Sequence, residues 1–240
     1  LVASGETFRT KNLIAATGSF KRPYFPIIKG SEDYLGEILH SAAYKNPKPF
    51  LNQNVIVVGR GNSAVQIGVE LSQLTNTTLA VLNPVKFVPQ TFLGKDLHFW
   101  LTVTGLDRFP FWRFGIKAGS STSVIDSNDF KSKLQKGLPK QRSMFTSFSS
   151  TGVVWADGKS EDIDAVIFAT GYRDHVPYLQ NLGALNSDGS PIQKAGVSSV
   201  VPGLYYLGLT GQRSFASATI RGTGGDAKII TKKIIRQTRN

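Results

Sequence analysis

The chain has 240 residues, of which 40% are hydrophobic, and its 28 basic and 16 acidic side chains give a formal net charge of +12. It contains no cysteine, which excludes disulfide scaffolds, thiolate metal sites, cysteine nucleophiles and redox-active cysteine pairs. Only three histidines are present and they are far apart, so we expect no metal site. No apolar run approaches the ~18 residues that span a membrane, and the first residues lack the apolar stretch of a signal peptide, so we expect a cytoplasmic protein without a membrane span.

A chain of this length holds one large domain or two modest ones. Residues 7–16 predict a strand or a strand pair that ends at Thr17-Gly18, and a loop rich in proline and aromatic residues follows. Beyond residues 34–44, a proline-rich link at residues 46–53 predicts a domain boundary.

Residues 54–82 follow the pattern strand, glycine turn, helix, strand. Residues 54–58 are a short, apolar, β-branched run, which is typical of a buried parallel strand. Apolar residues then recur at helical spacing over residues 63–74, and residues 78–82 predict the next strand. The stretch is therefore predicted to be a βαβ unit.

The turn inside this unit has the spacing G-x-G-x-x-A. Gly59 permits a tight turn, Gly61 lets the backbone approach a pyrophosphate, and the small Ala64 allows close packing of the helix on the strand. The N-terminus of the helix offers unpaired N–H groups and a partial positive charge to phosphates. Because the motif follows a strand and opens a helix, it predicts dinucleotide binding rather than a mere packing turn.

Polar side chains occupy the first turn of this helix. Asn62 and Ser63 are candidate donors to a pyrophosphate, although Ser63 alternatively serves as a plain N-cap. Ser63 and Gln66 also have the spacing of an S-x-x-Q capping box.

The end of the second predicted strand bears on the choice of nucleotide. An acidic residue ~20 positions beyond the glycines would bind a ribose 2′-hydroxyl and repel a 2′-phosphate. This chain has Leu82, Asn83 and Pro84 there, with no carboxylate, and Lys86 close behind. The sequence therefore favours NADPH over NADH, with Asn83 and Lys86 as candidate contacts, while Lys86 is equally well read as an ordinary exposed lysine.

Residues 85–118 are aromatic and basic, and they predict helices and loops. We expect the aromatic side chains of this stretch either to line a substrate channel or, as aromatic residues more often do, to form a buried cluster. These side chains are Trp100, Phe109, Phe111, Trp112 and Phe114. Residues 152–172 predict two strands around the turn Asp157-Gly158, the second of them running through Ala165 to Phe168. A further apolar strand is expected within residues 201–211.

A final helix is predicted from about Gly225 to Gln237. Basic residues cluster only here, and they alternate with isoleucines in the pattern of an amphipathic helix rather than of a nucleic-acid arm. We interpret the net charge as a solvated basic surface or as an attraction for nucleotide phosphates, and we expect no nucleic-acid partner.

Several motifs occur in the order found in one enzyme family. Residues 34–44 resemble its fingerprint F-x-G-x-x-x-H-x-x-x-[WFY], with Tyr34 in place of the first phenylalanine, and the glycine turn follows as it does in the family. Further similar segments are Phe87-Val88-Pro89, Phe92-Leu93-Gly94-Lys95-Asp96, the ATG-Y motif from Phe168 to Arg173, and Pro202 to Gly208. Over nearly its whole length the chain resembles the flavin-containing monooxygenases, particularly the bacterial members and the related plant indole-pyruvate monooxygenases.

The resemblance implies an α/β flavoprotein with two Rossmann-like dinucleotide-binding domains, which uses molecular oxygen and a small organic substrate. In such enzymes NADPH reduces FAD, oxygen adds to the reduced flavin, and a C4a-hydroperoxyflavin oxygenates a nitrogen, a sulfur or a carbonyl group. Because the cofactor performs this chemistry, few side-chain acids are needed, and the sequence indicates no triad or carboxylate pair to which catalysis could be assigned.

The family opens with a βαβ unit that carries its own glycine loop for FAD, and residues 1–33 contain no counterpart. Since the chain begins with Leu1 and Met144 is its only methionine, we expect an N-terminally truncated chain that binds FAD poorly and NADPH normally. The resemblance then implies three parts: residues 1–46 as the trailing part of the FAD-binding domain and linker, residues 47–165 as the NAD(P)-binding domain, and residues 166–240 as the return to the FAD-binding domain.

The resemblance also adds candidate cofactor contacts outside the glycine turn. Thr170 and Gly171 shape the turn where the chain returns from the NADP-binding part to the flavin side. They either touch a cofactor there or form a chain crossover without contact. His40 either contacts the cofactor, orients the linker or is a structural histidine. The full candidate set is Gly59, Gly61, Asn62, Ser63, Ala64, Gln66, Asn83, Lys86, Thr170, Gly171, Tyr172, Thr17, Gly18 and His40.

Four functions compete at this stage. The fingerprint at residues 34–44 favours an NAD(P)H- and FAD-dependent monooxygenase. A non-oxygenating flavin oxidoreductase has a similar build, but the absence of cysteine excludes its disulfide-reducing form. An isolated NADP-binding module without catalysis and a nucleic-acid-binding protein are the remaining alternatives.

Overall fold

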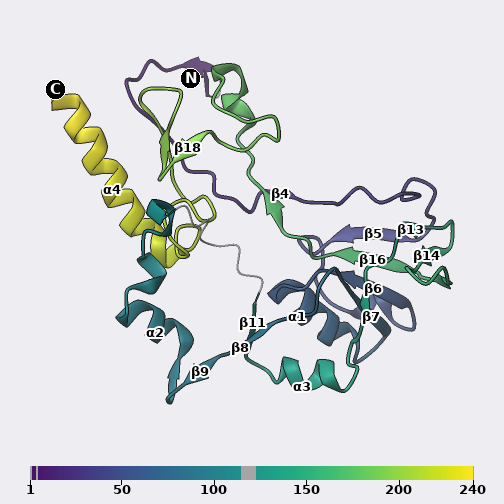
Figure 1. The fold of residues 1–240 in the computed structure, drawn as a ribbon. Coiled ribbons are helices and arrows are strands. Elements are labelled where there is room, and N and C mark those ends of the chain that lie inside the picture. The colour runs from purple at the N-terminus through teal and green to yellow at the C-terminus, as the bar shows by residue number, and fades with distance from the viewer. Residues whose placement is uncertain (1, 4, 115–122, 240) are drawn as a thin grey trace. The chain divides into compact units, whose positions relative to one another are not determined.

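The computed structural model describes residues 2–3, 5–114 and 123–239. The chain divides into two compact units, which Figure 1 shows as ribbons and which are described here one at a time. Unit 1 consists of Leu1–Arg22, His98–Ser121 and Tyr172–Asn240, and unit 2 consists of Pro23–Leu97 and Thr122–Gly171.

Unit 2 is built on a five-stranded parallel sheet with the strand order β12-β7-β6-β16-β5 (Figure 1). The strands are β5 (Glu37–His40), β6 (Asn54–Val58), β7 (Asn76–Val81), β12 (Lys140–Ser143) and β16 (Ala165–Phe168). Strand β6 and its connection through α1 (Asn62–Leu71) to β7 form the βαβ unit that the sequence predicts. This is the Rossmann-like architecture of dinucleotide-binding proteins.

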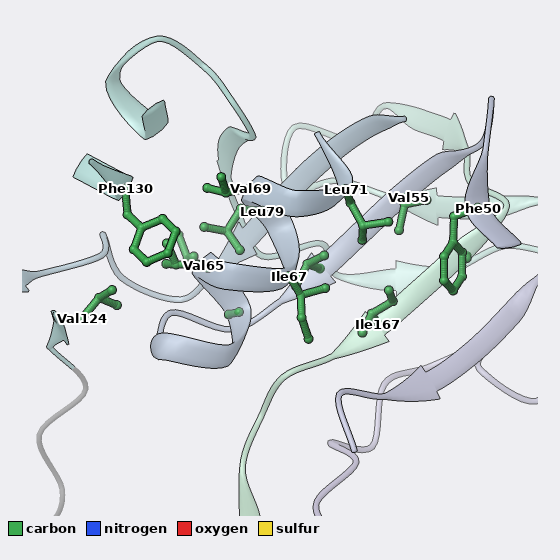
Figure 2. Close-up of a cluster of buried hydrophobic side chains, with 14 residues drawn as sticks. Phe50, Val55, Val65, Ile67, Val69, Leu71, Leu79, Val124, Phe130 and Ile167 are labelled. Carbon is green, nitrogen blue, oxygen red and sulfur yellow. The ribbon is translucent and has the colours of Figure 1, made fainter. Parts of the chain in front are cut away.

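Successive side chains of the central strands pack on opposite faces of this sheet. Val55 and Val57 contribute to a cluster with side chains of α1 and α3 (Phe130–Gln135), and Figure 2 shows these side chains converging between helices and sheet. Ile56 and Val58 contribute to a second cluster on the other face. Because both faces are covered, Val55 to Val58 of β6 are all apolar and buried, as the sequence indicated.

A three-stranded antiparallel sheet supplies much of that second cluster. It consists of β13 (Ser147–Phe148), β14 (Gly152–Val154) and β15 (Ser160–Asp162). The turn at Asp157-Gly158 joins β14 to β15, which confirms the predicted hairpin. The hairpin does not extend to Phe168, however, because Asp164 bonds to both the N–H and the C=O of Asn54 and directs the chain into the parallel sheet.

Residues 23–46 belong to unit 2, whereas the sequence-based division assigns them to the preceding part of the chain. The reason is that β5 pairs with β16 and completes the parallel sheet. Likewise, the described residues 98–114 group with unit 1, and unit 2 extends to Gly171, while the expected division into FAD-binding and NAD(P)-binding parts stays a prediction.

Short elements fill the stretch in which the sequence predicts only helices and loops. Among them are β8 (Phe87–Pro89), β9 (Thr91–Phe92), β10 (Lys95–Asp96), α2 (Leu97–Val103) and 3₁₀ helices at Leu106–Arg108 and Phe111–Phe114. β8 forms because it pairs in parallel with β11 (Val124–Asp126), a distant partner that local sequence does not reveal, while β9 pairs with β10. Another 3₁₀ helix spans Lys48–Phe50.

Those aromatic side chains of this stretch that the structure describes do not form the expected buried cluster. Phe109 and Phe114 stack with ring centroids 5.6 Å apart, yet they remain 40% and 65% exposed. Trp100 is half-buried, and the side chains of Phe111 and Trp112 lie outside the described part of the chain.

Unit 1 contains a four-stranded sheet with the order β18-β19-β20-β3, in which β20 and β3 are parallel. The bounds are β3 (Leu13–Ala15), β18 (Gln193–Lys194), β19 (Val197–Ser198) and β20 (Leu204–Tyr206). Buried side chains of β3 and β20 pack against the 3₁₀ helix Pro177–Leu182. Two further pairs are β1 (Val2–Ala3) with β2 (Glu6–Thr7), and β4 (Arg22–Pro23) with β17 (Tyr172–Arg173).

The last helix, α4 (Ile220–Arg239), begins earlier than the predicted Gly225. Glycines are poor helix formers, so the sequence alone places the start too late. Gly222 is required in the first turn because a Cβ there would overlap Ala216. Two ion pairs also hold this end: Asp107 with Arg221 at 3.1 Å, and Asp226 with Arg213 at 2.8 Å.

Candidate dinucleotide-binding site

Gly59 shapes the turn between β6 and α1. Its φ of 139° lies in a region that favours glycine, and a Cβ at this position would lie 2.5 Å from the Ala169 carbonyl oxygen. The Gly59 N–H donates to the Ala80 carbonyl at 3.0 Å. The first glycine of the motif therefore holds the turn tightly against the two neighbouring strands.

Gly61 has a different environment, because a Cβ added there would meet no protein atom within 4 Å. Gly61 is also the N-cap residue of α1, and no side chain caps the helix. The first helical bond runs from the Val65 N–H to the Gly61 carbonyl at 3.1 Å. The N–H groups of the first turn thus open onto free space, which suits an anion such as a phosphate.

The polar residues after Gly61 do not cap the helix. With Gly61 as N-cap, neither the expected Ser63 cap nor the Ser63–Gln66 capping box forms. The Asn62 side-chain oxygen accepts from the Ile125 N–H at 3.1 Å, which ties the turn to β11. Ala64 is fully buried, and its small side chain permits the close packing of α1 on the sheet.

A pocket of about 650 Å³ lies beside this turn, at the carboxyl ends of β6, β7 and β16. All of its lining residues belong to unit 2. They come from the glycine turn (Val58 to Gly61), the end of β7 (Ala80 and Leu82), Met144 to Thr146, Ala169 to Gly171, Tyr24, and Pro26 to Lys29. Ligands of α/β proteins bind at this edge of a parallel sheet.

Four of the predicted site residues line this pocket: Gly59, Gly61, Thr170 and Gly171. The crossover Thr170-Gly171 bonds to Tyr24, since the Tyr24 N–H donates to the Gly171 carbonyl at 3.0 Å and the Thr170 hydroxyl donates to the Tyr24 carbonyl. The segment Tyr24–Lys29, here called the strap, is thereby fixed as one wall of the pocket.

His40 is buried and holds the same crossover in place. Its Nδ1 accepts from the Ala42 N–H at 3.1 Å, so the proton resides on Nε2, which donates to the Gly171 carbonyl at 3.0 Å. Burial lowers the pKa of His40, and the bond to Gly171 opposes that effect more weakly. His40 does not line the pocket, and its contacts are those of a neutral histidine that positions Gly171.

The other fingerprint residues also serve as anchors within unit 2. The Tyr34 hydroxyl donates to the Ile163 carbonyl at 2.7 Å, and burial raises the pKa of Tyr34 to about 12. Gly36 is required because a Cβ would overlap the Tyr34 ring. Tyr44 donates to Glu70 of α1 at 2.9 Å.

Three predicted residues lie elsewhere on unit 2. Asn83 and Lys86 are exposed and do not line the pocket, and the Lys86 carbonyl accepts from the Val124 N–H at 2.7 Å where β8 and β11 pair. Gln66 lines a separate groove of about 700 Å³ between α1 and the residues around Phe130.

The remaining predicted residues belong to unit 1. Thr17 and Gly18 follow β3, and Gly208 follows the neighbouring parallel strand β20. A Cβ at Gly208 would lie 3.7 Å from the Gly18 Cα, so the two glycine turns meet at the carboxyl ends of these strands. Tyr172 packs edge-on against Phe20 with ring centroids 5.5 Å apart.

Sequence reasoning missed the strap and Arg60 as parts of the pocket. Arg60 could have been noticed, since it stands between the two glycines of the motif. The strap gave no signal beyond its prolines.

Among the described residues, no group of three or more His, Cys, Asp or Glu side chains is arranged to hold a metal. None of the described helices combines the length and the apolar character that a membrane span requires.

Comparison with known proteins agrees with this geometry. Residues 1–107 match the family model described as pyridine nucleotide-disulphide oxidoreductase, and residues 81–187 match the one described as flavin-binding monooxygenase-like. The uncharacterized oxidoreductase CzcO of Bacillus subtilis strain 168 is 32% identical over 241 residues, covering 95% of this chain and 66% of that protein.

Two further relatives carry functional names. Indole-3-pyruvate monooxygenase YUCCA4 of Oryza sativa subsp. japonica is 28% identical over 261 residues, covering 96% of this chain and 58% of that protein. The structure of a flavin-containing monooxygenase from Stenotrophomonas maltophilia superposes with a TM-score of 0.76 at 27% identity, covering 94% of this chain and 62% of that one. The chain thus spans roughly three fifths to two thirds of the length of these relatives.

The parallel sheet, the glycine turn that opens α1 and these matches all agree with one another. The family-model matches, the relatives and the structural neighbours support a protein of the flavin-containing monooxygenase family, and the two matched families imply FAD and NAD(P)H as cofactors.

Proposed function

We propose that this chain is part of an NAD(P)H- and FAD-dependent monooxygenase, and that the pocket of unit 2 binds the nicotinamide dinucleotide. The substrate is a small organic molecule that is oxygenated at nitrogen, sulfur or a carbonyl group, with molecular oxygen as co-substrate. The matches to this family support the reaction class.

The observation that carries the nucleotide assignment is the uncapped N-terminus of α1 beside a free volume. The space at Gly61 is empty of protein atoms, so the backbone there can approach a diphosphate closely. The first-turn N–H groups and the positive end of the helix dipole face that space. The residues present therefore fit a dinucleotide.

The cofactors carry the redox chemistry when bound, NAD(P)H as hydride donor and FAD as the group at which oxygen reacts. The chain supplies binding and orientation. Gly59 and Ala64 fix the turn, α1 binds phosphate through its N-terminus, and His40 sets the position of the Gly171 carbonyl at the pocket wall.

Gly61→Val tests the assignment. Valine adopts the φ of −90° and ψ of −176° found there, and its Cβ meets no protein atom, so only the weaker N-cap preference of valine should lower the free energy of unfolding, by about 1 kcal/mol or less. The side chain would instead fill the place of the diphosphate. We expect NADPH affinity, measured by titration calorimetry, to fall by at least ~100-fold, since several charge-assisted hydrogen bonds are lost.

Gly59→Ala is the matched control in the same motif. Its Cβ would collide with the Ala169 carbonyl and its φ would be strained, so we expect it to lower the free energy of unfolding by ~2 kcal/mol or more. Urea denaturation of both variants separates the two roles. Unchanged NADPH affinity in a folded Gly61→Val chain would refute the site.

Oxygen consumption separates the proposed activity from the alternatives. With FAD and NAD(P)H added, a monooxygenase consumes oxygen and transfers one oxygen atom to an amine, sulfide or ketone, which mass spectrometry detects. A non-oxygenating oxidoreductase would oxidise NAD(P)H without an oxygenated product. An isolated binding module would bind the nucleotide and leave it unreacted.

A further inference from the structure

The chain contains a single sulfur atom, that of Met144, because it has one methionine and no cysteine. Met144 directly follows β12, and its N–H donates to the Val81 carbonyl at the end of β7 at 3.0 Å. This bond fixes Met144 at the carboxyl edge of the parallel sheet, where it lines the pocket beside the glycine turn. The one oxidisable sulfur of the protein therefore lies in the candidate nucleotide site.

Met144 is only partly buried, in contrast to the residue that follows it. Phe145 is 3% exposed, and its ring packs edge-on against that of Phe148 with centroids 5.0 Å apart. Met144 packs against the same hydrophobic cluster, but it also borders the open pocket volume of about 650 Å³. A small oxidant can therefore reach Met144 from the pocket.

The pocket lining that belongs to this cluster is otherwise apolar and includes Ile28, Val58 and Ala80. A thioether suits these surroundings because it is flexible, polarisable and apolar. A sulfoxide is polar, and its added oxygen needs a hydrogen-bond donor that aliphatic side chains do not offer. Oxidation would therefore favour conformations that turn the side chain from the cluster into the open volume.

We propose that Met144 is an oxidation site that controls access to the pocket: hydrogen peroxide converts its thioether to a sulfoxide, and the sulfoxide weakens nucleotide binding. The sulfur attacks one peroxide oxygen, the S–O bond forms as the O–O bond breaks, and the departing hydroxide takes the proton of the transferred hydroxyl and leaves as water. The sulfur loses two electrons and the peroxide gains them. The proposal rests on the proposed function, namely that the pocket binds a nicotinamide dinucleotide.

The test compares three chains. Met144→Leu removes the sulfur from the unaltered chain and nearly conserves the side-chain volume. The third chain combines Met144→Leu with Leu74→Met, which moves the only methionine to a position that is 48% exposed and outside the pocket lining. Each chain is treated with hydrogen peroxide and desalted. Tandem mass spectrometry locates the added oxygen, titration calorimetry gives the dissociation constant for NADP⁺, and circular dichroism confirms the fold.

We expect the treated unaltered chain to carry one added oxygen on Met144 and to bind NADP⁺ about 10-fold or more weakly, because a polar group replaces part of an apolar lining. Met144→Leu should bind NADP⁺ within about 2-fold of the untreated, unaltered chain, both before and after treatment. The relocated methionine should be oxidised without loss of affinity, since it does not touch the pocket.

Bound nucleotide should protect the sulfur. NADP⁺ at about ten times its dissociation constant leaves the pocket empty for about a tenth of the time, so it should slow the oxidation of Met144 by up to about 10-fold. Oxidation of the relocated methionine should keep its rate in the presence of NADP⁺. Equal rates for Met144 with and without the nucleotide would contradict its position in the site.

Equal NADP⁺ affinity before and after oxidation of Met144 would overturn the proposal. An unmodified Met144 under conditions that oxidise the relocated methionine would overturn it as well, and so would an equal loss of affinity in treated Met144→Leu, which would trace the damage to other residues. Failure of the proposed function is a distinct outcome, since the untreated, unaltered chain would then bind no NADP⁺, and this proposal would fall with it.

Discussion

Gly59 and Gly61 are the same residue type in one motif, yet the structure uses them for opposite reasons. Gly59 is glycine because protein atoms surround the place of a Cβ, and Gly61 is glycine although no protein atom is near. The sequence motif predicts both residues, since its spacing and its strand-to-helix context are local features. The effect of a substitution at each position follows only from the three-dimensional contacts.

Side-chain assignments near the motif were less predictable. The sequence offers Ser63 as a cap and Lys86 as a phosphate contact, but Gly61 caps the helix and Lys86 lies outside the pocket. Lys29 lines the pocket because the strap returns to the sheet edge from earlier in the chain, whereas Arg60 lies in the motif itself. Such a return is a long-range contact that no local pattern encodes.

His40 gives a pH-dependent prediction. Because burial lowers its pKa below 6.5, the folded chain binds fewer protons at this residue than the unfolded chain does at pH values just below 6.5. The contribution of neutral His40 to stability is thus fully present above about pH 6.5 and is lost as the pH falls through the folded pKa. Urea unfolding between about pH 5 and pH 7 should show this decline.

His40→Gln is the comparison for this measurement, since an amide can still donate to the Gly171 carbonyl but does not titrate. The decline below about pH 6.5 should be shallower in the variant than in the unaltered chain. The same slope in both chains would show that other groups cause it.

Individual elements divide into those whose partners are local and those whose partners are distant. The succession β6, α1, β7 was predictable because strand, turn and helix are contiguous and each has a clear apolar period. The pairing of β16 with both β5 and β6, and of β8 with β11, was not, because each involves residues far apart in the chain. The glycine-rich start of α4 was missed because tertiary contacts stabilise it against its low propensity.

The attachment of α4 provides a second prediction. The Asp226–Arg213 pair has side chains only 5% and 17% exposed, whereas the Lys159–Asp157 pair has side chains 81% and 51% exposed. Asp226→Ala leaves an unpaired, largely buried arginine and should lower the free energy of unfolding by ~3 kcal/mol. Lys159→Ala should change it by less than ~0.5 kcal/mol. Urea denaturation of both variants measures the difference, and equal effects would contradict the importance of the buried pair.

The whole molecule carries a net charge of +12, which attracts anionic nucleotides from a distance. Because NADPH carries more negative charge than NADH, its affinity should depend more steeply on salt. Raising sodium chloride from ~0.1 M to ~1 M shortens the screening length from ~10 Å to ~3 Å and should weaken NADPH binding more than NADH binding. Titration calorimetry at both salt concentrations checks this, and parallel losses would argue against a contribution from the extra phosphate.

The position of β16 between β5 and β6 in the parallel sheet also constrains how the protein is made. The neighbours of this strand, β5 and β6, are synthesised long before it, and within the described sheet β5 has no other partner. Until Ala165–Phe168 have left the ribosome, β5 and one edge of β6 remain unpaired. Open strand edges are templates for pairing with other chains. Nascent chains of this protein therefore pass through an aggregation-prone interval, which ends only when the last strand of the sheet is inserted.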